Sequence, residues 1–403
     1  MEHQADRRRL LSGAGAAVGS GLLISSESSV SARAGTGSCR PIPPRPVAPV
    51  NQPIAARHGL TYTAMPLQAA GVDVEPMITI NAAADVAAKR HRLVDYIWKG
   101  AGLPARRPTV RRGVSAPAFG TLTRVSRIDE LTVPLGYGVR STVFHILPRR
   151  PATPRIAIYH NGHGEPFDTM LRTIQGLLNE GCSVLACAMP FRHWNAQRIT
   201  DPKDPAKRVE LRSHDDLARW ESSAFSALTF FLEPVAVALN HVIATYRPAS
   251  VQMIGLSGGG WTTTVYAAID PRVTRSYPTA GSLPFYLRPA APNATSSIGD
   301  WEQRGDTLPG FYGIAGYLDL YVMAAAGHGR RQVQILNRFD SCCFAGVGHR
   351  GYAPAVSHRV SAIGAGHWEV LEDATHDQHT ISPYALSVIL WDLRTDQDTV
   401  PSV

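Results

Sequence analysis

The sequence predicts an α/β fold with a doubly wound, mostly parallel sheet, and three observations lead to that fold class. From about residue 155 onward, short apolar runs typical of buried parallel strands alternate with helix-compatible stretches. The run 155–160 passes directly into a glycine-rich segment. The run that starts at Val251 also ends in glycines, and these open a helix-compatible stretch. Folds of this class bind their ligands outside the carboxyl ends of the parallel strands.

The first 34 residues resemble a twin-arginine signal peptide. Arg7, Arg8 and Arg9 precede about fifteen apolar and small residues, and a small-residue site at 32–34 follows them. The apolar run is too short to span a bilayer, so no stable membrane anchor is expected after cleavage. The resemblance implies export to the periplasm or the extracellular space. An uncleaved amphipathic tail is the alternative.

Residues 35–80 are predicted to form a proline-rich linker and an N-terminal extension. Six prolines between residues 41 and 53 predict an extended conformation for residues 35–57. Asn81 is then the expected N-cap of a helix that runs to about Trp98, with Gly100 as its stop signal. This helix opens the predicted domain 81–403. The sequence assigns no role to residues 58–120.

The remaining elements follow from the apolar periodicity and from the residues that interrupt it. Short apolar or alternating runs predict strands, and a period of 3.6 residues predicts helices. Within 251–269 we expect a strand that leads to Ser257 and a helix that follows it. The other expected strands are 125–133, 139–147, 155–160, 182–189, 273–279, 331–338 and 367–372, and the other expected helices are 167–180, 223–246, 316–326 and 383–394.

Composition and charge narrow the classes of partner and cofactor. With 403 residues and 44% hydrophobic residues, the chain can bury a full core. The net charge of +8 comes mostly from scattered arginines that form no aromatic-interleaved basic stripe, so no nucleic-acid partner is expected. No histidine or cysteine spacing matches a zinc motif, and the sequence predicts neither a metal nor a cofactor. Free thiols are expected at Cys182, Cys187, Cys342 and Cys343.

The most informative motif is Gly255-Leu256-Ser257-Gly258-Gly259, which matches the pattern G-x-S-x-G. Placed between a strand and a helix, this pattern is typical of a nucleophile elbow. Glycine at 255 and 259 removes side chains that would collide across so tight a turn. Ser257 is therefore the candidate nucleophile.

A second glycine-rich segment, 160–165, follows directly after the strand 155–160. Its backbone amides can turn toward the nucleophile and stabilise a developing negative charge. We expect an oxyanion hole made by the amides of Gly258, Gly162 and His163. A plain strand-to-helix turn is the alternative for this segment.

The candidate acid and base lie late in the chain. Asp340 follows the apolar strand 331–338, and His379 stands just ahead of the final helix. The order Ser, Asp, His places the acid and the base after the nucleophile, so His379 is the expected general base, held by Asp340. The alternatives that the sequence leaves open are His376 for the base and Asp319, Asp373 and Asp377 for the acid.

Taken together, the elbow, the His-Asn-Gly-His-Gly loop, the late aspartate and the final Asp-Gln-His resemble the α/β-hydrolase family over residues 120–395. The resemblance implies an α/β-hydrolase fold and a serine esterase that cleaves carboxylic esters through an acyl-enzyme intermediate. A peptidase or an acyltransferase of the same fold, or a non-catalytic binding protein that retains the fold, are the alternatives.

Aromatic residues lie in two segments that are expected to form the rim of the pocket. These are an insertion at 281–312, which contains Trp301, and the stretch 191–195, which contains Trp194. Together with Trp261, which follows the elbow, these tryptophans are the predicted substrate contacts. Aromatic residues among polar ones suit a carbohydrate ester or a small aromatic ester, and packing of the insertion itself is the alternative.

Overall fold

The fold is described by a computed structural model that covers residues 43–149 and 155–395. Apart from Pro43, these residues belong to one unit that begins at Pro44. The predicted signal peptide 1–34, the start of the predicted linker and Cys39 lie outside the described residues. Among those described, no helix is long and apolar enough to cross a membrane.

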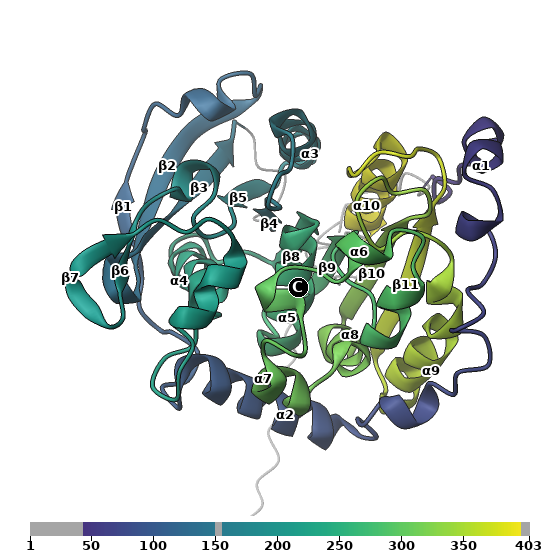
Figure 1. The fold of residues 1–403 in the computed structure, drawn as a ribbon. Coiled ribbons are helices and arrows are strands. Elements are labelled where there is room, and N and C mark those ends of the chain that lie inside the picture. The colour runs from purple at the N-terminus through teal and green to yellow at the C-terminus, as the bar shows by residue number, and fades with distance from the viewer. Residues whose placement is uncertain (1–42, 150–154, 396–403) are drawn as a thin grey trace, which may run out of the picture. The chain divides into compact units, whose positions relative to one another are not determined.

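The described residues form a nine-stranded central sheet with the order β1-β2-β3-β5-β4-β8-β9-β10-β11 and a separate hairpin, β6-β7. The sheet runs across Figure 1 from β1 to β11. The strands are β1 Thr109–Arg111, β2 Val125–Pro134, β3 Arg140–Pro148, β4 Arg155–His160, β5 Ser183–Cys187, β6 Ile199–Asp201, β7 Asp204–Val209, β8 Ser250–Leu256, β9 Arg275–Thr279, β10 Arg330–Asn337 and β11 Gly366–Asp373.

The sheet has an antiparallel edge and a parallel remainder. Strands β1, β2, β3 and β5 pair antiparallel, whereas every pair from β5 through β11 is parallel. Because parallel strands share their direction, the segments that follow β4, β8, β10 and β11 emerge at the same edge of the sheet. Those four segments carry all three predicted catalytic residues and the glycine-rich loop 160–165. The predicted mostly parallel α/β fold is therefore confirmed.

Helices cover both faces of the sheet (Figure 1). One face packs against α3 and α10, and the other packs against α4, α5, α8 and α9, with α2 outside this layer. The α-helices are α1 Gln52–His58, α2 Ala83–Trp98, α3 Phe167–Asn179, α4 Thr229–Tyr246, α5 Gly258–Ile269, α6 Ala294–Ser297, α7 Pro309–Ile314, α8 Tyr317–Ala325, α9 Ala353–Ile363 and α10 Pro383–Thr395.

The composition of the helices explains these positions. Helices α5 and α8 are buried along their whole length, because both lie between the sheet and outer elements. Helix α3 instead has one buried face, which includes Met170, Ile174 and Leu177, and its opposite face is solvated. A helix with one apolar stripe covers a sheet from outside, and one that is apolar all round needs a second layer. Helix α2 supplies part of that second layer.

Two features of the N-terminal half differ from the expectations. Residues 52–58 form helix α1 although the prolines predict an extended linker there. Pro53 stands in the first turn, where a proline costs no hydrogen bond, and the Asn51 side chain caps the helix by accepting from the Ile54 amide. The strand β1 and the hairpin β6-β7 were not predicted, because β1 and β7 are mostly exposed and the buried β6 has only three residues, so no apolar pattern marks them.

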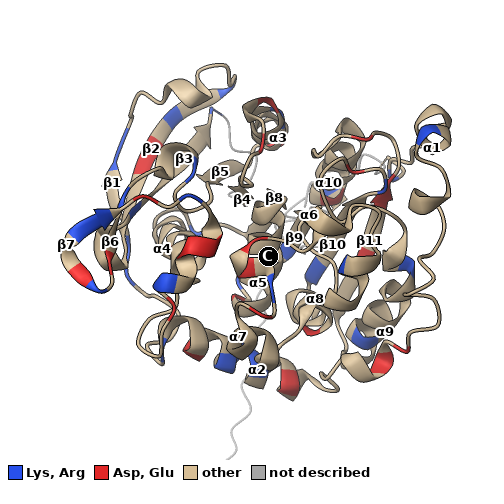
Figure 2. Cartoon of the chain, in the orientation of Figure 1, with Lys and Arg blue, Asp and Glu red and all other residues tan. Residues whose placement is uncertain are grey.

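Charged residues are spread over the described elements without a one-sided basic surface (Figure 2). Many arginines pair locally with carboxylates, as Arg350 does with Glu372 and Arg394 with Glu180.

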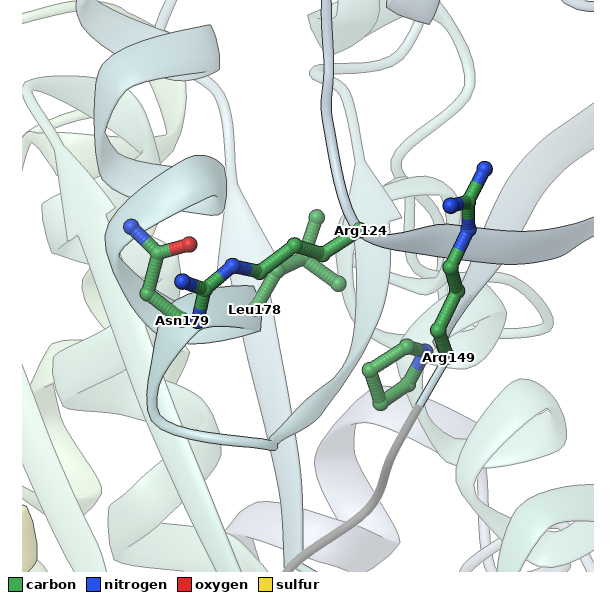
Figure 3. A pocket seen from close by; sticks show the side chains of 5 residues that line it. Arg124, Arg149, Leu178 and Asn179 are labelled. Carbon is green, nitrogen blue, oxygen red and sulfur yellow. The ribbon is translucent and has the colours of Figure 1, made fainter.

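One hollow of about 420 Å³ lies away from the predicted catalytic residues and is lined by Arg124, Pro148, Arg149, Leu178 and Asn179. Figure 3 shows the Arg124 side chain extending toward Leu178 and Asn179, whereas Arg149 points away from them. The hollow lies at the C-terminal end of α3, which belongs to the amino-end side of the parallel strands. It contains no nucleophile, acid or base, so it offers no catalytic group.

Candidate active site

Ser257 occupies a strained turn between β8 and α5. Its backbone has φ 59° and ψ −125°, a combination that a non-glycine residue seldom adopts. A Cβ atom at Gly255 would lie 2.2 Å from the Gly259 carbonyl oxygen, and one at Gly259 would lie 2.0 Å from the His160 carbonyl oxygen. Both glycines are therefore sterically required, as the elbow motif predicts. The surrounding structure keeps Ser257 in this strained conformation at the carboxyl end of β8.

His379 and Asp340 lie in direct contact although 39 residues separate them. The Nδ1 atom of His379 is 2.9 Å from each carboxylate oxygen of Asp340. The contact arises because Asp340 follows β10 and His379 follows the neighbouring parallel strand β11. Burial alone would lower the pKa of His379, but the hydrogen bond and the charge of Asp340 outweigh it, and the net effect raises the pKa.

The Asp340 carboxylate is fully buried and held from three sides besides His379. Its Oδ1 accepts hydrogen bonds from the amides of Cys342 and Cys343, at 2.8 Å and 3.1 Å. Its Oδ2 accepts one from the Asn337 side chain at 2.9 Å. These donors keep the carboxylate oriented and compensate for its burial. Both cysteines are free thiols, as expected.

The alternative acids and the alternative base make their contacts with other residues. His376 lies 3.4 Å from Asp373, and its Nδ1 accepts the Gln378 amide. Asp377 pairs with Arg57 at the surface, and the buried Asp319 accepts hydrogen bonds from the backbone and side chain of Thr79. The geometry therefore brings together the pair that the sequence favours.

A cavity of about 420 Å³ connects Ser257 with His379, since both residues line it. The Nε2 atom of His379 is buried and has no hydrogen-bond partner among the described residues. An unpartnered, shielded ring nitrogen in a residue that shares a cavity with a serine is an arrangement that suits a general base. No hydrogen bond joins Ser257 to His379 in this structure, which is common when a catalytic site holds no substrate. A second hollow of about 390 Å³ shares His379 and Gly164 with this cavity.

The predicted oxyanion donors are close to Ser257 but differ in their availability. Gly258 opens α5, where first-turn amides lack an acceptor within the helix. A Cβ atom at Gly162 would lie 3.0 Å from the Ser257 Cβ, so the loop approaches the elbow closely. The Gly162 amide, however, donates to Glu165 at 3.0 Å. Of the two predicted loop amides, that of Gly162 is thus engaged by Glu165, which leaves that of His163 as the candidate partner of Gly258.

Glu165 is a buried carboxyl on the cavity wall that the sequence alone did not single out. One oxygen accepts the Gly162 amide and the other contacts the Tyr159 hydroxyl. Burial raises the pKa of Glu165 to about 7, against the opposing effect of those hydrogen bonds. Its position next to the two loop glycines, Gly162 and Gly164, was the available signal, because a carboxylate can organise the amides of such a loop.

A second histidine system borders the cavity and was not predicted either. His163 lines the cavity, and its ring contacts Glu302 at 3.0 Å and His214 at 2.8 Å. Burial alone would raise the pKa of Glu302, but the two histidines lower it well below its usual value. These residues come from three distant segments, so no sequence spacing could have revealed the cluster.

The three predicted substrate tryptophans do not line the cavity. Trp261 and Trp301 are at most 1% exposed, and Trp261 donates its indole N–H to Tyr312. Trp194 packs edge-on against Phe119 and donates to the Thr142 carbonyl. The three tryptophan rings therefore pack in the protein interior. Packing in place of substrate contact is the alternative that the sequence left open for the insertion.

The insertion 281–312 does border the cavity, but through smaller polar residues. It carries the helix α6 and contributes Thr295, Ser296, Gly299, Asp300 and Gln303 to the lining. The predicted pocket rim is therefore present, with a different set of contacting side chains.

Helix α1 braces the loops that carry the acid and the base. The Asn51 amide donates to the Ala374 carbonyl at 2.9 Å, and Arg57 donates to Asp377. The His58 ring stacks on Phe339, the residue before Asp340, with ring centroids 5.4 Å apart. The N-terminal extension therefore packs against both loops instead of forming a free linker.

Comparison with known proteins supports the fold. No protein-family model and no curated protein sequence matches the chain. Among solved structures, the chain is similar to "Methylesterase BT1017" (TM-score 0.52, 14% identity, 78% of this chain and 63% of that one). It is also similar to acetyl xylan esterase 1 from Thermoanaerobacterium sp. JW/SL YS485 (TM-score 0.50, 16% identity, 81% and 99%) and to an acetyl xylan esterase from Paenibacillus sp. R4 (TM-score 0.50, 14% identity, 82% and 99%). The chain thus has the α/β-hydrolase fold of these esterases, and it spans less than two thirds of the methylesterase chain.

Proposed function

We propose that this protein is a serine hydrolase that cleaves carboxylic esters through an acyl-enzyme intermediate. One observation carries the proposal. A histidine held by a buried aspartate has its free nitrogen at a cavity that also contains a serine on a strained elbow. Serine, histidine and aspartate in this relation are the parts of an acyl-transfer site. The shared fold with esterases agrees with this reaction class.

The reaction follows from these positions. The Ser257 hydroxyl attacks the ester carbonyl while His379 Nε2 takes its proton, and Asp340 stabilises the imidazolium that forms. The amides of Gly258 and His163 stabilise the negative oxygen of the tetrahedral intermediate. His379 then gives the proton to the departing alcohol, and water releases the acyl group by the same steps.

The cavity favours a small polar ester as the substrate. Its volume of about 420 Å³ is near the lower end of the usual range of ligand sites, about 300–1,000 Å³. The lining contributed by the insertion is rich in hydroxyl, amide and carboxylate groups, among them Ser296, Gln303 and Asp300. Such groups recognise hydroxyl-bearing molecules, and the similar structures include two acetyl xylan esterases. We therefore assign a short acyl ester of a carbohydrate as the substrate class.

The test is covalent labelling with a fluorophosphonate probe, which reacts with activated serines. The wild type and Ser257→Ala are compared with Ser296→Ala, which removes another hydroxyl from the same cavity. We expect labelling of the wild type and of Ser296→Ala and none of Ser257→Ala. Hydrolysis of acetylated sugars should then be lost in Ser257→Ala alone.

Three results would contradict the proposal. A folded wild type that stays unlabelled would favour a non-catalytic binding protein. A labelled wild type that cleaves aminoacyl amides but no esters would favour a peptidase. Transfer of the acyl group to an added alcohol in place of water would favour an acyltransferase.

A further inference from the structure

His163, His214 and Glu302 meet at the wall of the cavity. The His163 Nε2 atom lies 2.8 Å from His214 Nδ1 and 3.0 Å from Glu302 Oε1, and His214 Nδ1 lies 3.2 Å from Glu302 Oε2. His214 and Glu302 are at most 2% exposed. The nitrogen, nitrogen and carboxylate atoms therefore face one another inside a closed triangle.

The hydrogen-bond partners of the outer ring nitrogens determine whether the inner nitrogens of the two histidines carry protons or lone pairs. His214 Nε2 lies 3.0 Å from the Pro190 carbonyl oxygen, which can only accept, so this nitrogen carries a proton. His163 Nδ1 lies 3.3 Å from a carboxylate oxygen of Asp300, which favours a proton there as well. With one proton on each ring at these outer positions, both inner nitrogens present lone pairs. The third inward group, the Glu302 carboxylate, is also an acceptor.

Protons alone do not give every inward-facing atom of this triangle a hydrogen-bond partner. One extra proton on His214 Nδ1 can be shared between His163 Nε2 and Glu302 Oε2, but it leaves Glu302 Oε1 without a donor. A proton on each inner nitrogen instead sets two N–H groups against each other at 2.8 Å. In addition, Glu302 Oε1 is buried and makes no hydrogen bond, although it lies 3.0 Å from His163. The oxygen is near that nitrogen but off the direction in which an N–H would point.

We propose that His163, His214 and Glu302 bind a divalent transition-metal ion, with zinc as the best match. One cation at the centre accepts from both inner nitrogens and from the carboxylate at once, whereas a shared proton leaves Glu302 Oε1 without a donor. Two imidazoles and one carboxylate are a known zinc ligand set that leaves a fourth position for water. Off-axis neighbours are expected there, because ligand atoms aim at the ion and not at each other.

The contacts around the triangle match those of metal ligands. A metal-bound histidine usually donates its other N–H to a carbonyl or a carboxylate, which fixes the ring. Pro190 and Asp300 supply such acceptors here. In a tetrahedral site with bonds of about 2.0–2.2 Å, ligand atoms are about 3.3–3.6 Å apart. The triangle must therefore expand by a few tenths of an ångström to admit the ion.

The ion would join three segments that are far apart in the sequence. These are the loop after β4, the residues around 214 and the insertion 281–312. The His163 ring also lies against the elbow, since a Cβ atom at Gly258 would be 2.4 Å from its Cε1 atom. Bound metal thus fixes one wall of the cavity and the loop that approaches Ser257 at Gly162. This function is distinct from ester cleavage, so either proposal can fail alone.

The test is metal analysis of the full chain produced in zinc-supplied medium, followed by chelation and reloading with zinc chloride. We expect about one zinc per chain, a melting temperature that falls by about 5 °C or more after chelation, and its recovery on reloading. Glu302→Gln and His214→Gln should each weaken zinc binding by about 100-fold or more. His349→Gln is the matched control, because His349 is buried 3.2 Å from Glu372 without a second histidine.

The outcomes separate a specific site from adventitious metal. Zinc lost in Glu302→Gln and His214→Gln but retained in His349→Gln supports the proposal. Wild type that carries no metal, and whose melting temperature is unchanged by chelator and by zinc, overturns it. Equal zinc content in the wild type and in Glu302→Gln overturns it too. The chelation experiment on wild type still decides if a variant fails to fold.

Discussion

His379 and His163 line the same cavity, but the first has a free ring nitrogen and the second has none. His379 uses Nδ1 for Asp340, and its Nε2 has no partner within 43–149 and 155–395. His163 engages both nitrogens, with Asp300 on one side and with His214 and Glu302 on the other. Burial opposes the charged form of both rings, and neighbouring carboxylates raise the pKa of each.

The difference shows that proximity to the nucleophile and a raised pKa do not identify a base. A base must have a nitrogen free to take the proton of the serine, whereas a nitrogen already bound to a fixed partner holds structure in place. One carboxylate orients a ring and leaves it reactive, as Asp340 does for His379. Several acceptors around one ring immobilise it, as at His163.

The largest difference between the two histidines is expected when each one is exchanged for glutamine. His379→Gln removes the base, and we expect a loss of about 10⁴-fold or more in kcat, measured on an acetylated sugar. His163→Gln keeps the base and alters only the wall, so a loss of about tenfold is expected. A larger loss in His163→Gln than in His379→Gln would reverse the assignment. Circular dichroism confirms that both variants fold.

Exchanging the carboxylate beside each histidine tests whether the two carboxylates contribute differently to catalysis. Asp340→Asn leaves the volume unchanged but removes the charge that orients His379 and stabilises its protonated form, so kcat should fall by about 10³–10⁴-fold. Asp300→Asn removes a charge from a half-exposed partner of His163, and a change within about tenfold is expected. Comparable losses in the two variants would show that the two pairs contribute alike.

The smallest expected effect is a change in pH dependence. His379 must be neutral to act, so kcat/KM should fall as the pH decreases through its raised pKa, tenfold per unit. In Asp340→Asn this limb should move to lower pH, because the effect that raises the pKa is removed. The limb is measured in Glu165→Gln as well, since Glu165 has a pKa of about 7 and titrates in the same range.

The same raised pKa has a defined sign for stability. The folded state favours protonated His379, so its contribution to the free energy of unfolding is complete below the unfolded value of about 6.5. That contribution is lost as the pH rises through the folded pKa. Chemical unfolding of the wild type and of Asp340→Asn between pH 5 and 9 measures it, and an identical pH dependence in both would contradict it.

Most of the fold could be predicted because its strands are apolar and its turns carry glycine. The run 155–160 matches β4 at both ends, and β10, β11 and α10 lie within a residue or two of their expected bounds. The helix predicted from 223 begins only at Thr229. The elements missed include the exposed strand β7, which has no apolar pattern, and helix α1, whose proline was misleading. Helix α9 was missed as well, although Val356 and Val360 form a buried apolar stripe along it.

The contact between His379 and Asp340 could be predicted because topology places the ends of neighbouring parallel strands together. The cavity wall could not, because His163, Glu302 and His214 meet only through the insertion 281–312, whose course no periodicity describes. The tryptophans show the reverse problem. Trp261 and Trp301 were expected at the substrate because of their residue type, but burial of large rings in the core determines their place.

Helix α1 moves the boundary of the functional unit. Ile54, Phe339 and Ala374 form a small core of their own, so residues near 54 complete the support of the loops that end in Asp340 and His379. A fragment cut at residue 81, where the sequence places the start of the domain, would retain every strand of the sheet. It would nonetheless expose Phe339. It would also remove Asn51 and Arg57, which donate hydrogen bonds to Ala374 and Asp377 in the loop that precedes His379. For any fusion or truncation of this chain, the working unit therefore starts before Asn51.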